Sequence, residues 1–95
     1  MTSKPLIYLV AGEPSGDALG GRLMTALRRR LSDKVDFAGV GGESMQAEGL
    51  TSLFPMEELS VMGIVEILPH ARALFRRMSQ VAGDIDRLSP DAVVT

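Results

Sequence analysis

A turn of six residues, 12–17, constrains this chain more than any other feature. It reads Gly-Glu-Pro-Ser-Gly-Asp, follows the wholly apolar run 6–11, and precedes a stretch with helical spacing. A buried strand that breaks into a glycine-containing turn and then a helix is how α/β folds place ligand sites at the carboxyl edge of a parallel sheet. The sequence therefore predicts a strand, a ligand-facing turn and a helix. We refer to residues 12–17 as the acidic elbow.

The rest of the chain continues to alternate strands and helices, which predicts the α/β class with a parallel sheet. Apolar residues spaced by three and four from 64 to 88 predict a long helix, regular from about Pro69 and ended by Pro90. Residues 56–63 are expected to form a loop with one helical turn. The other expected elements are a helix over 15–31 with Ser15 as N-cap, a strand over 35–40, a helix over 45–48 with Ser44 as N-cap and Gly49 as its stop, and strands over 51–54 and 91–95.

Length, charge and cysteine content exclude several function classes. With 95 residues the chain forms at most one domain, and a net charge of −2 gives no basic field for nucleic acid. The absence of cysteine excludes disulfides and thiolate metal sites, and the single histidine, His70, cannot build a histidine-rich metal site. Because a parallel sheet needs both faces covered and the run 91–95 stops before its ligand-facing end, we expect residues 1–95 to be the truncated first part of a larger protein.

The acidic elbow carries two carboxylates, Glu13 and Asp17, and no lysine. A Walker A loop needs Gly-Lys-Ser/Thr where Gly16-Asp17-Ala18 stands, so ATP binding of that kind is excluded. Residues 39–44 begin a dinucleotide fingerprint but have a serine where its last glycine belongs. Ionised carboxylates accept hydrogen bonds from hydroxyl groups, which suits a sugar better than a phosphate. Alternatively, Asp17 caps a helix and Glu13 is a solvated turn residue; the residues alone leave both interpretations open.

Three further features also have two interpretations each. The apolar stripe of the long helix either packs on the sheet or is partly exposed to an anionic bilayer or acyl chains. The pair Glu57 and Glu58 either serves acid–base chemistry or forms the exposed first turn of a helix. Bunched arginines are either solvated helix faces or a surface for a phosphate or lipid headgroup. They are Arg28, Arg29 and Arg30, and Arg72, Arg76 and Arg77.

Four motifs occur in a fixed order along the chain. They are Val-Ala-Gly-Glu-Pro-Ser-Gly-Asp at 10–17, Gly-Val-Gly-Gly at 39–42, Met-Gln-Ala-Glu-Gly at 45–49, and Met-Glu-Glu-Leu-Ser-Val-Met-Gly-Ile-Val-Glu at 56–66. Together they resemble the lipid-A-disaccharide synthase family over essentially the whole chain. The resemblance implies the incomplete N-terminal half of a GT-B glycosyltransferase, with a Rossmann-like three-layer parallel sheet. In such an enzyme this half holds the acceptor, and a C-terminal half, absent here, holds the UDP donor.

The resemblance also implies a reaction. Such a hexosyltransferase moves 2,3-diacylglucosamine from its UDP carrier to 2,3-diacylglucosamine 1-phosphate, which gives the β-1,6 disaccharide of lipid A and UDP. It works with inversion and without a metal or cofactor, and inversion needs a base for the acceptor hydroxyl. The implied location is peripheral, on the cytoplasmic face of the inner membrane of a Gram-negative bacterium. Because the donor half and an aspartate loop beyond residue 95 are missing, we expect the chain alone to be inactive.

Matching motif positions assigns roles to individual residues. Glu13 and Asp17 are the expected catalytic carboxylates. The expected substrate-binding residues are Gly12, Ser15, Gly16, Met56, Glu57, Glu58, Met62 and Gly63. The expected membrane or acyl contacts are Val65, Ile67, Leu68, Ala71, Leu74 and Phe75. The alternative, from another class, is a small flavodoxin-like or receiver-like module whose elbow binds a nucleotide, a phosphate or magnesium.

Overall fold

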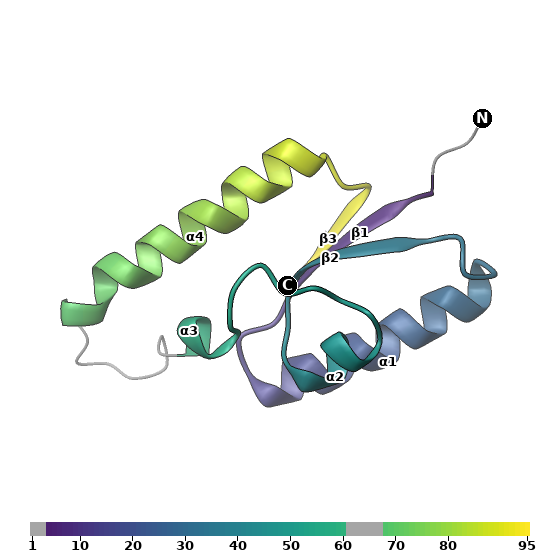
Figure 1. Ribbon diagram of the computed structural model, residues 1–95, viewed down its shortest axis with the longest axis horizontal. Coiled ribbons are helices and arrows are strands. Elements are labelled where there is room, and N and C mark those ends of the chain that lie inside the picture. Colours follow the sequence, from purple (N-terminus) through teal and green to yellow (C-terminus); the bar gives the residue numbers. More distant parts are fainter. Residues whose placement is uncertain (1–3, 61–67) are drawn as a thin grey trace.

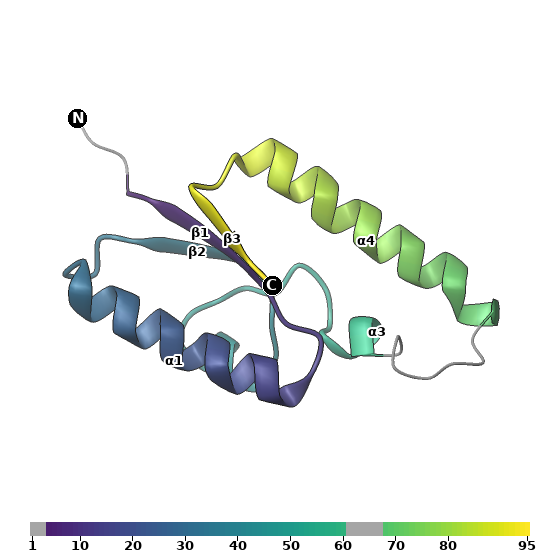
Figure 2. The same cartoon turned by 180° about the vertical axis from the view of Figure 1, so that it is seen from behind.

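A computed structural model describes residues 4–60 and 68–95, with side chains described for all of these except 60 and 68–75. Figures 1 and 2 show a sheet with α1 and α2 on one side and α4 on the other, so the predicted α/β class is confirmed. The described elements are β1 (Leu6–Val10), α1 (Pro14–Arg30), β2 (Asp36–Val40), α2 (Glu43–Ala47), α3 (Glu57–Ser60), α4 (Leu68–Leu88) and β3 (Ala92–Val94).

The three strands form a parallel sheet in the order β2-β1-β3. The central strand β1 pairs with β2 from Leu6↔Asp36 onwards and with β3 from Ile7↔Ala92 onwards. Neighbouring side chains of a strand point to opposite faces of a sheet. Tyr8 and Leu9 are both buried, so β1 is covered on both faces. This explains why its sequence is apolar throughout rather than alternating.

The main core lies on the α1 side of the sheet. Gly20 and Gly21 of α1 allow α2 to approach closely: a Cβ at Gly20 would lie 2.5 Å from the sulfur of Met45, and one at Gly21 would lie 3.2 Å from the carbonyl oxygen of Ser44. A side chain at Gly21 would therefore press on the backbone of α2, and one at Gly20 would displace the side chain of Met45. The buried residues of this core are Leu9, Ala11, Met24, Val40, Met45, Leu50, Phe54, Met56 and Leu59.

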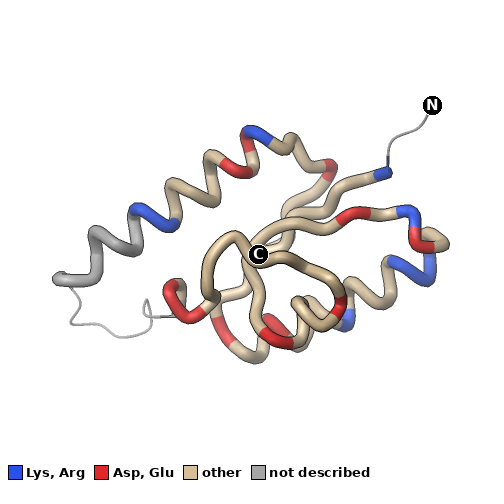
Figure 3. The backbone as a smooth tube through the Cα atoms, in the orientation of Figure 1, with Lys and Arg blue, Asp and Glu red and all other residues tan. Residues whose placement is uncertain are grey.

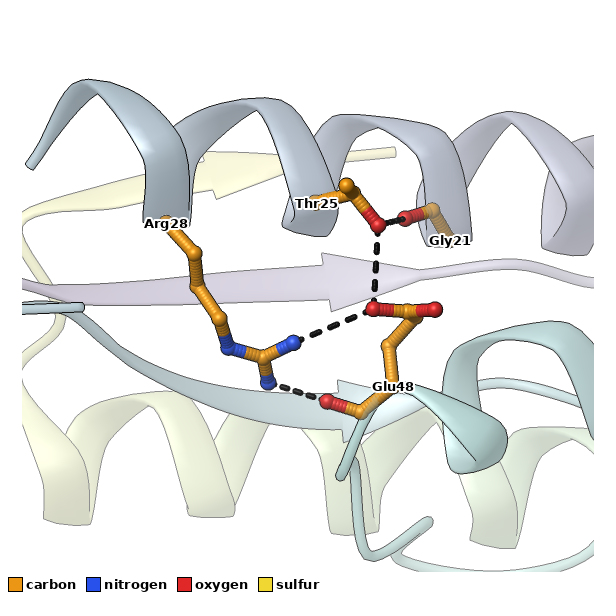
Figure 4. A network of polar contacts seen from close by, with 4 residues as sticks. All are labelled: Gly21, Thr25, Arg28 and Glu48. Carbon is orange, nitrogen blue, oxygen red and sulfur yellow. Dashed lines mark hydrogen bonds and ion pairs between the residues drawn. The ribbon is translucent and has the colours of Figure 1, made fainter. Parts of the chain in front are cut away.

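A clasp of polar contacts joins α1 to the end of α2 (Figure 4). Arg28 Nη1 lies 3.2 Å from Glu48 Oε1, and Nη2 donates to the backbone carbonyl of the same residue. The Thr25 hydroxyl lies 2.9 Å from Glu48 Oε1, and the Arg28 guanidinium lies over the Phe37 ring at 5.3 Å. This arginine is therefore part of the fold. Of the first arginine group, only Arg29 and Arg30 are exposed.

The expected strand over 51–54 is wrong. Only Ser52 pairs with the sheet, in an isolated parallel bridge to Gly39. The Ser52 hydroxyl accepts the N–H of Gly41 at 3.1 Å and donates to the carbonyl of Phe54 at 2.6 Å. These contacts fold the segment into a turn, and Pro55 has no N–H with which to extend a ladder. The bridge lies beyond β2, where a further parallel strand would pair.

Both expected N-caps are also wrong. The first helix begins at Pro14 with Glu13 as its extended N-cap (φ −143°, ψ 157°), because proline is favoured at the first helical position. The short helix begins at Glu43 with Gly42 as its N-cap. Other expectations are confirmed: Gly49 has the left-handed φ of 106° expected of a helix stop. The regular part of the long helix begins at Leu68, beside Pro69, and ends at Leu88.

The C-terminal part of α4 is fixed to the sheet through a buried tyrosine. Tyr8 is 0% exposed, and its hydroxyl donates to Asp84 Oδ2 at 2.8 Å. Burial first, and then the hydrogen bond to Asp84, raises the pKa of Tyr8, so this hydroxyl stays a donor throughout the physiological range. None of the helices within the described ranges is long and apolar enough to cross a membrane.

Tyr8→Phe is expected to lower the free energy of unfolding by about 1–3 kcal/mol, because it leaves the Asp84 carboxylate without its buried donor. Urea unfolding followed by circular dichroism measures this loss. In an Asp84→Ala background the same substitution should cost much less, because the acceptor is already absent. A loss of less than about 0.5 kcal/mol in the parent chain would contradict the prediction.

Candidate functional site

Three segments converge at the carboxyl edge of the sheet: the acidic elbow, the glycine turn 41–42 and α3. The Ala11 N–H donates to the carbonyl of Val40 at 2.9 Å, so the two strands are still paired where the elbow begins. A Cβ at Gly12 would lie 3.5 Å from Leu59 Cβ, which places α3 beside the elbow. The structure thus brings together motifs that are up to 48 residues apart in the sequence, from Gly12 to Ser60. This edge is where α/β folds bind ligands.

Asp17 is buried beneath this edge, with only 5% of its surface exposed. Its carboxylate accepts three backbone N–H groups: those of Gly42 at 2.8 Å, Ser44 at 2.8 Å and Met45 at 3.0 Å. The carboxylate therefore caps the start of α2 from a neighbouring helix, which is why Ser44 is not needed as the cap. The Ser44 side chain also hydrogen-bonds to this carboxylate. The predicted part of Asp17 in catalysis stays a prediction.

The ionisation of Asp17 follows from these contacts. Burial works to raise the pKa of the carboxyl, but the amide hydrogen bonds from Met45, Ser44 and Gly42 together outweigh it, and the pKa lies below its ordinary value. Asp17 is therefore a carboxylate at neutral pH and a poor proton acceptor. A base that takes a proton from a hydroxyl group needs a more accessible oxygen.

Glu13 and Ser15 are the exposed polar residues of the elbow. Among the described residues, the Glu13 carboxylate makes no hydrogen bond or ion pair, and as the N-cap residue it makes no side-chain capping bond. Its backbone carbonyl accepts the N–H of Asp17 at 3.0 Å, which holds the residue at the top of α1. Of the two elbow carboxylates, Glu13 is thus the one that faces solvent and is open to a ligand.

The second group of expected substrate residues divides between core and surface. Met56 is buried, and its methyl carbon would lie 3.0 Å from a Cβ at Gly42, so it packs under the glycine turn. Glu58 accepts two hydrogen bonds from Arg77, at 2.6 Å and 2.9 Å, which lowers the pKa of this carboxyl. The Arg77 guanidinium also lies 4.8 Å over the Phe54 ring. This contact joins α3 to α4; the neighbouring Glu57 side chain is exposed.

The remaining expected site residues lie outside what the structure describes. Met62, Gly63, Val65 and Ile67 fall within 61–67. Leu68, Ala71, Leu74 and Phe75 belong to the first turns of α4, but their side chains are not described. Whether the apolar stripe of the long helix contacts the sheet or a membrane therefore stays open for these positions.

An apolar cavity of about 200 Å³ adjoins the elbow on the α1 side of the sheet. Sequence reasoning did not predict it, because Leu19 and Leu23 fit the core-facing pattern of the first helix. Instead Leu19 is 64% exposed at its rim. The lining residues are Leu9, Val10, Ala11, Gly16, Leu19, Gly20, Leu23, Met45, Val94 and Thr95.

The charge at this edge is predominantly acidic. Figure 3 shows Asp and Glu around the elbow, α2 and α3, whereas Lys and Arg lie mainly toward the other end of α1 and along α4. Within the described ranges, no group of three or more His, Asp or Glu side chains is arranged to hold a metal ion. The open Glu13 carboxylate in such surroundings suits the hydroxyl group of a ligand, because an ionised carboxylate accepts O–H hydrogen bonds.

Comparison with known proteins identifies the group to which the chain belongs. The curated lipid-A-disaccharide synthase of Paramagnetospirillum magneticum is 67% identical over 90 residues, which is 95% of this chain and 23% of that protein. Those of Rhodospirillum centenum and Granulibacter bethesdensis are each 54% identical, over 97% and 96% of this chain and 23% of each relative. The chain therefore spans about a quarter of the length of these relatives.

The family profile described as lipid-A-disaccharide synthetase matches residues 7–95. This range includes the acidic elbow, the glycine turn and α3, which are the segments that meet at the carboxyl edge. Such a match favours this family over the flavodoxin-like or receiver-like module, whose case rested on the elbow alone. By this match the chain belongs to the lipid-A-disaccharide synthetase family.

Proposed function

We propose that this chain forms the acceptor-binding part of a glycosyltransferase that makes the lipid A disaccharide. The proposed donor is UDP-2,3-diacylglucosamine, the acceptor is 2,3-diacylglucosamine 1-phosphate, and the products are the β-1,6 disaccharide and UDP. The UDP-sugar is a substrate, so no cofactor or metal is invoked. The observation that carries this proposal is the family match over a segment whose acidic elbow lies at the carboxyl edge of a parallel sheet.

In this proposal Glu13 orients the acceptor hydroxyl or takes its proton. The hydroxyl oxygen attacks the anomeric carbon, the bond to UDP breaks, and the hydroxyl proton passes to the carboxylate. Two features support Glu13: its carboxylate is exposed, and it has no partner among the described residues. Ser15 and the backbone at Gly12 and Gly16 complete the proposed acceptor-facing turn. Glu57, Met62 and Gly63 remain proposed substrate contacts.

We propose further that the protein works at the surface of the inner membrane. The direction of α4 supports this. Its 21 residues span about 31 Å, far more than the five-residue strand β1. Its C-terminal part lies over the sheet, and its N-terminal part extends past the carboxyl edge (Figure 1). The first turns of α4, which carry the proposed acyl-contacting residues Leu68, Ala71, Leu74 and Phe75, are therefore at the same end of the fold as Glu13.

A chimaera tests the proposed function. This chain replaces the matching 90 residues of the Paramagnetospirillum magneticum relative, to which it is 67% identical. The purified full-length chimaera should convert the two proposed substrates to disaccharide and UDP. A folded chimaera that forms no disaccharide would contradict the proposal.

Glu13→Gln in the chimaera is expected to lower kcat about 10²-fold, because the amide keeps the shape of the side chain but cannot accept the proton. The thermal unfolding midpoint should stay close to that of the parent, because no described residue depends on this carboxylate. Ser32→Ala, on an exposed residue in the turn that follows α1, serves as the control and should leave kcat unchanged. Turnover of Glu13→Gln near the parent value would remove Glu13 from the mechanism.

A further inference from the structure

A buried side chain connects the two loops that border the proposed acceptor site. Asp17 belongs to the first turn of α1, and the three amides that it accepts belong to the segment 42–45, at least 25 residues later. We propose that Asp17 is a positioning residue that acts through Glu13: it fixes the acidic elbow against the glycine turn and does not itself touch the acceptor. This inference rests on the proposed function of the elbow.

The hydrogen bonds of Asp17 leave little capacity for a substrate. Oδ1 accepts the N–H groups of Gly42 and Met45, Oδ2 accepts that of Ser44, and the Ser44 side chain hydrogen-bonds to the same carboxylate. The side chain is buried, so a substrate hydroxyl would have to displace a backbone amide to reach it. Displacing an amide would leave a buried donor without a partner, which is costly. Direct contact between Asp17 and the acceptor is therefore unfavourable. The hydrogen bonds of Asp17 to the segment 42–45 instead fix the position of the acidic elbow.

Asp17 also fixes the position of Glu13 through the backbone. The Asp17 N–H donates to the Glu13 carbonyl at 3.0 Å, so the two residues are one helical turn apart and rigidly linked. On the opposite side, a Cβ at Gly42 would lie 2.8 Å from Asp17 Oδ2 and 3.0 Å from the methyl carbon of Met56. The carboxylate is thus enclosed, and a shift of either loop must move the other.

A double-mutant cycle in the full-length chimaera separates this role from independent catalysis. Asp17→Asn alone is expected to lower kcat about 10²-fold, because small displacements of a catalytic group have effects of this size. In a Glu13→Gln background, Asp17→Asn should lower kcat by less than about threefold more, because the group through which it acts is already disabled. A further drop of about 10²-fold in the double variant would overturn the inference.

Gly42→Ala tests the same contact without removing the carboxylate. Its Cβ would intrude on Asp17, so kcat should fall at least about tenfold while KM for the UDP donor stays unchanged. Gly83→Ala is the matched control, because a Cβ there meets nothing within 4 Å, and it should leave kcat within about twofold of the parent. Parent-like kcat in Gly42→Ala, with Asp17→Asn inactive and folded, would overturn the positioning role and assign the carboxylate to catalysis.

Amide hydrogen exchange distinguishes a failure of this inference from a failure of the proposed function. The N–H groups of Gly42, Ser44 and Met45 should exchange slowly in the parent chimaera and at least about tenfold faster in Asp17→Asn, with little change in β1. Unchanged exchange in Asp17→Asn would overturn the inference even if the chimaera makes disaccharide. If the parent chimaera has no activity, the proposed function is wrong, whatever the exchange rates. The positioning role is then wrong as well, because it concerns that activity.

Discussion

Gly39→Ala is expected to lower the free energy of unfolding by at least about 4 kcal/mol, enough to abolish cooperative folding of a marginally stable chain. Two effects add here. The backbone of Gly39 has a φ of 135°, which residues with a Cβ rarely adopt. A Cβ built at this position would also lie 1.8 Å from the carbonyl oxygen of Leu9, in the middle of the β1–β2 pairing. The strand β1 cannot move aside, because it is paired with β3 on its other edge as well.

Urea unfolding of the parent chain and of Gly39→Ala, followed by circular dichroism, measures this loss. Gly83→Ala carries the same chemical change in open space on α4, and it should be neutral or stabilising by up to about 1 kcal/mol. The contrast between the two variants separates the local clash from the general effect of adding a methyl group. A loss below about 1 kcal/mol at Gly39 would be inconsistent with the described geometry.

Asp17→Ala is expected to lower the free energy of unfolding by about 3 kcal/mol or more. The substitution leaves the N–H groups of Gly42 and Met45, both on buried residues, and that of Ser44 without their acceptor. Each buried donor without a partner costs about 1–3 kcal/mol, and the cap of α2 is lost with them. Glu43→Ala, an exposed acidic residue in the first turn of the same helix, is the matched control and should cost less than about 0.5 kcal/mol. Urea unfolding compares the two.

The same carboxylate makes stability depend on pH in a defined direction. Because the pKa of Asp17 is lower in the folded than in the unfolded chain, its contribution is complete above the unfolded value and is lost as pH falls through the folded one. The parent should therefore lose stability below about pH 4. Glu58, whose pKa the contact with Arg77 lowers, acts with the same sign. Asp17→Asn should make the free energy of unfolding less dependent on pH in the acid range. Glu58→Gln should remove the part of this dependence that arises from the contact between Glu58 and Arg77. An unchanged acid profile in Asp17→Asn would contradict the assignment.

The sequence predicted those elements that have a clear pattern of apolar residues within the element itself. A continuous apolar run predicts a strand buried on both faces, and β1 forms where this run lies. Apolar residues spaced by three and four predict a helix with one apolar face, and α4 forms where this spacing occurs. The acidic elbow lies at the carboxyl edge of the sheet because a strand followed by a helix in a parallel sheet leaves its turn there. These conclusions needed only neighbouring residues and the geometry of a parallel sheet.

Contacts between distant segments could not be predicted from patterns. Asp17 caps a helix 25 residues later, so the expected cap Ser44 is replaced by a group that no local spacing connects to it. Arg28 and Arg77 looked like parts of exposed basic faces, but each has a carboxylate partner about 20 residues away and an aromatic ring beneath it. The segment 51–54 has the composition of a strand, yet the Ser52 hydroxyl turns the backbone after one bridge. In each case tertiary packing outweighs local preference.

The order of the strands in the sheet also affects how the chain emerges from the ribosome. The middle strand β1 is synthesised before both of its neighbours, and its pairing with β3, from Ile7 to Ala92, spans a sequence separation of 85 residues. At about 5–20 residues per second, roughly 4–17 seconds pass before that neighbour exists. Until then the apolar strand β1 has one edge without a partner. Such an edge can bind chaperones or aggregate, so the interval before β3 is synthesised is a vulnerable stage for this fold.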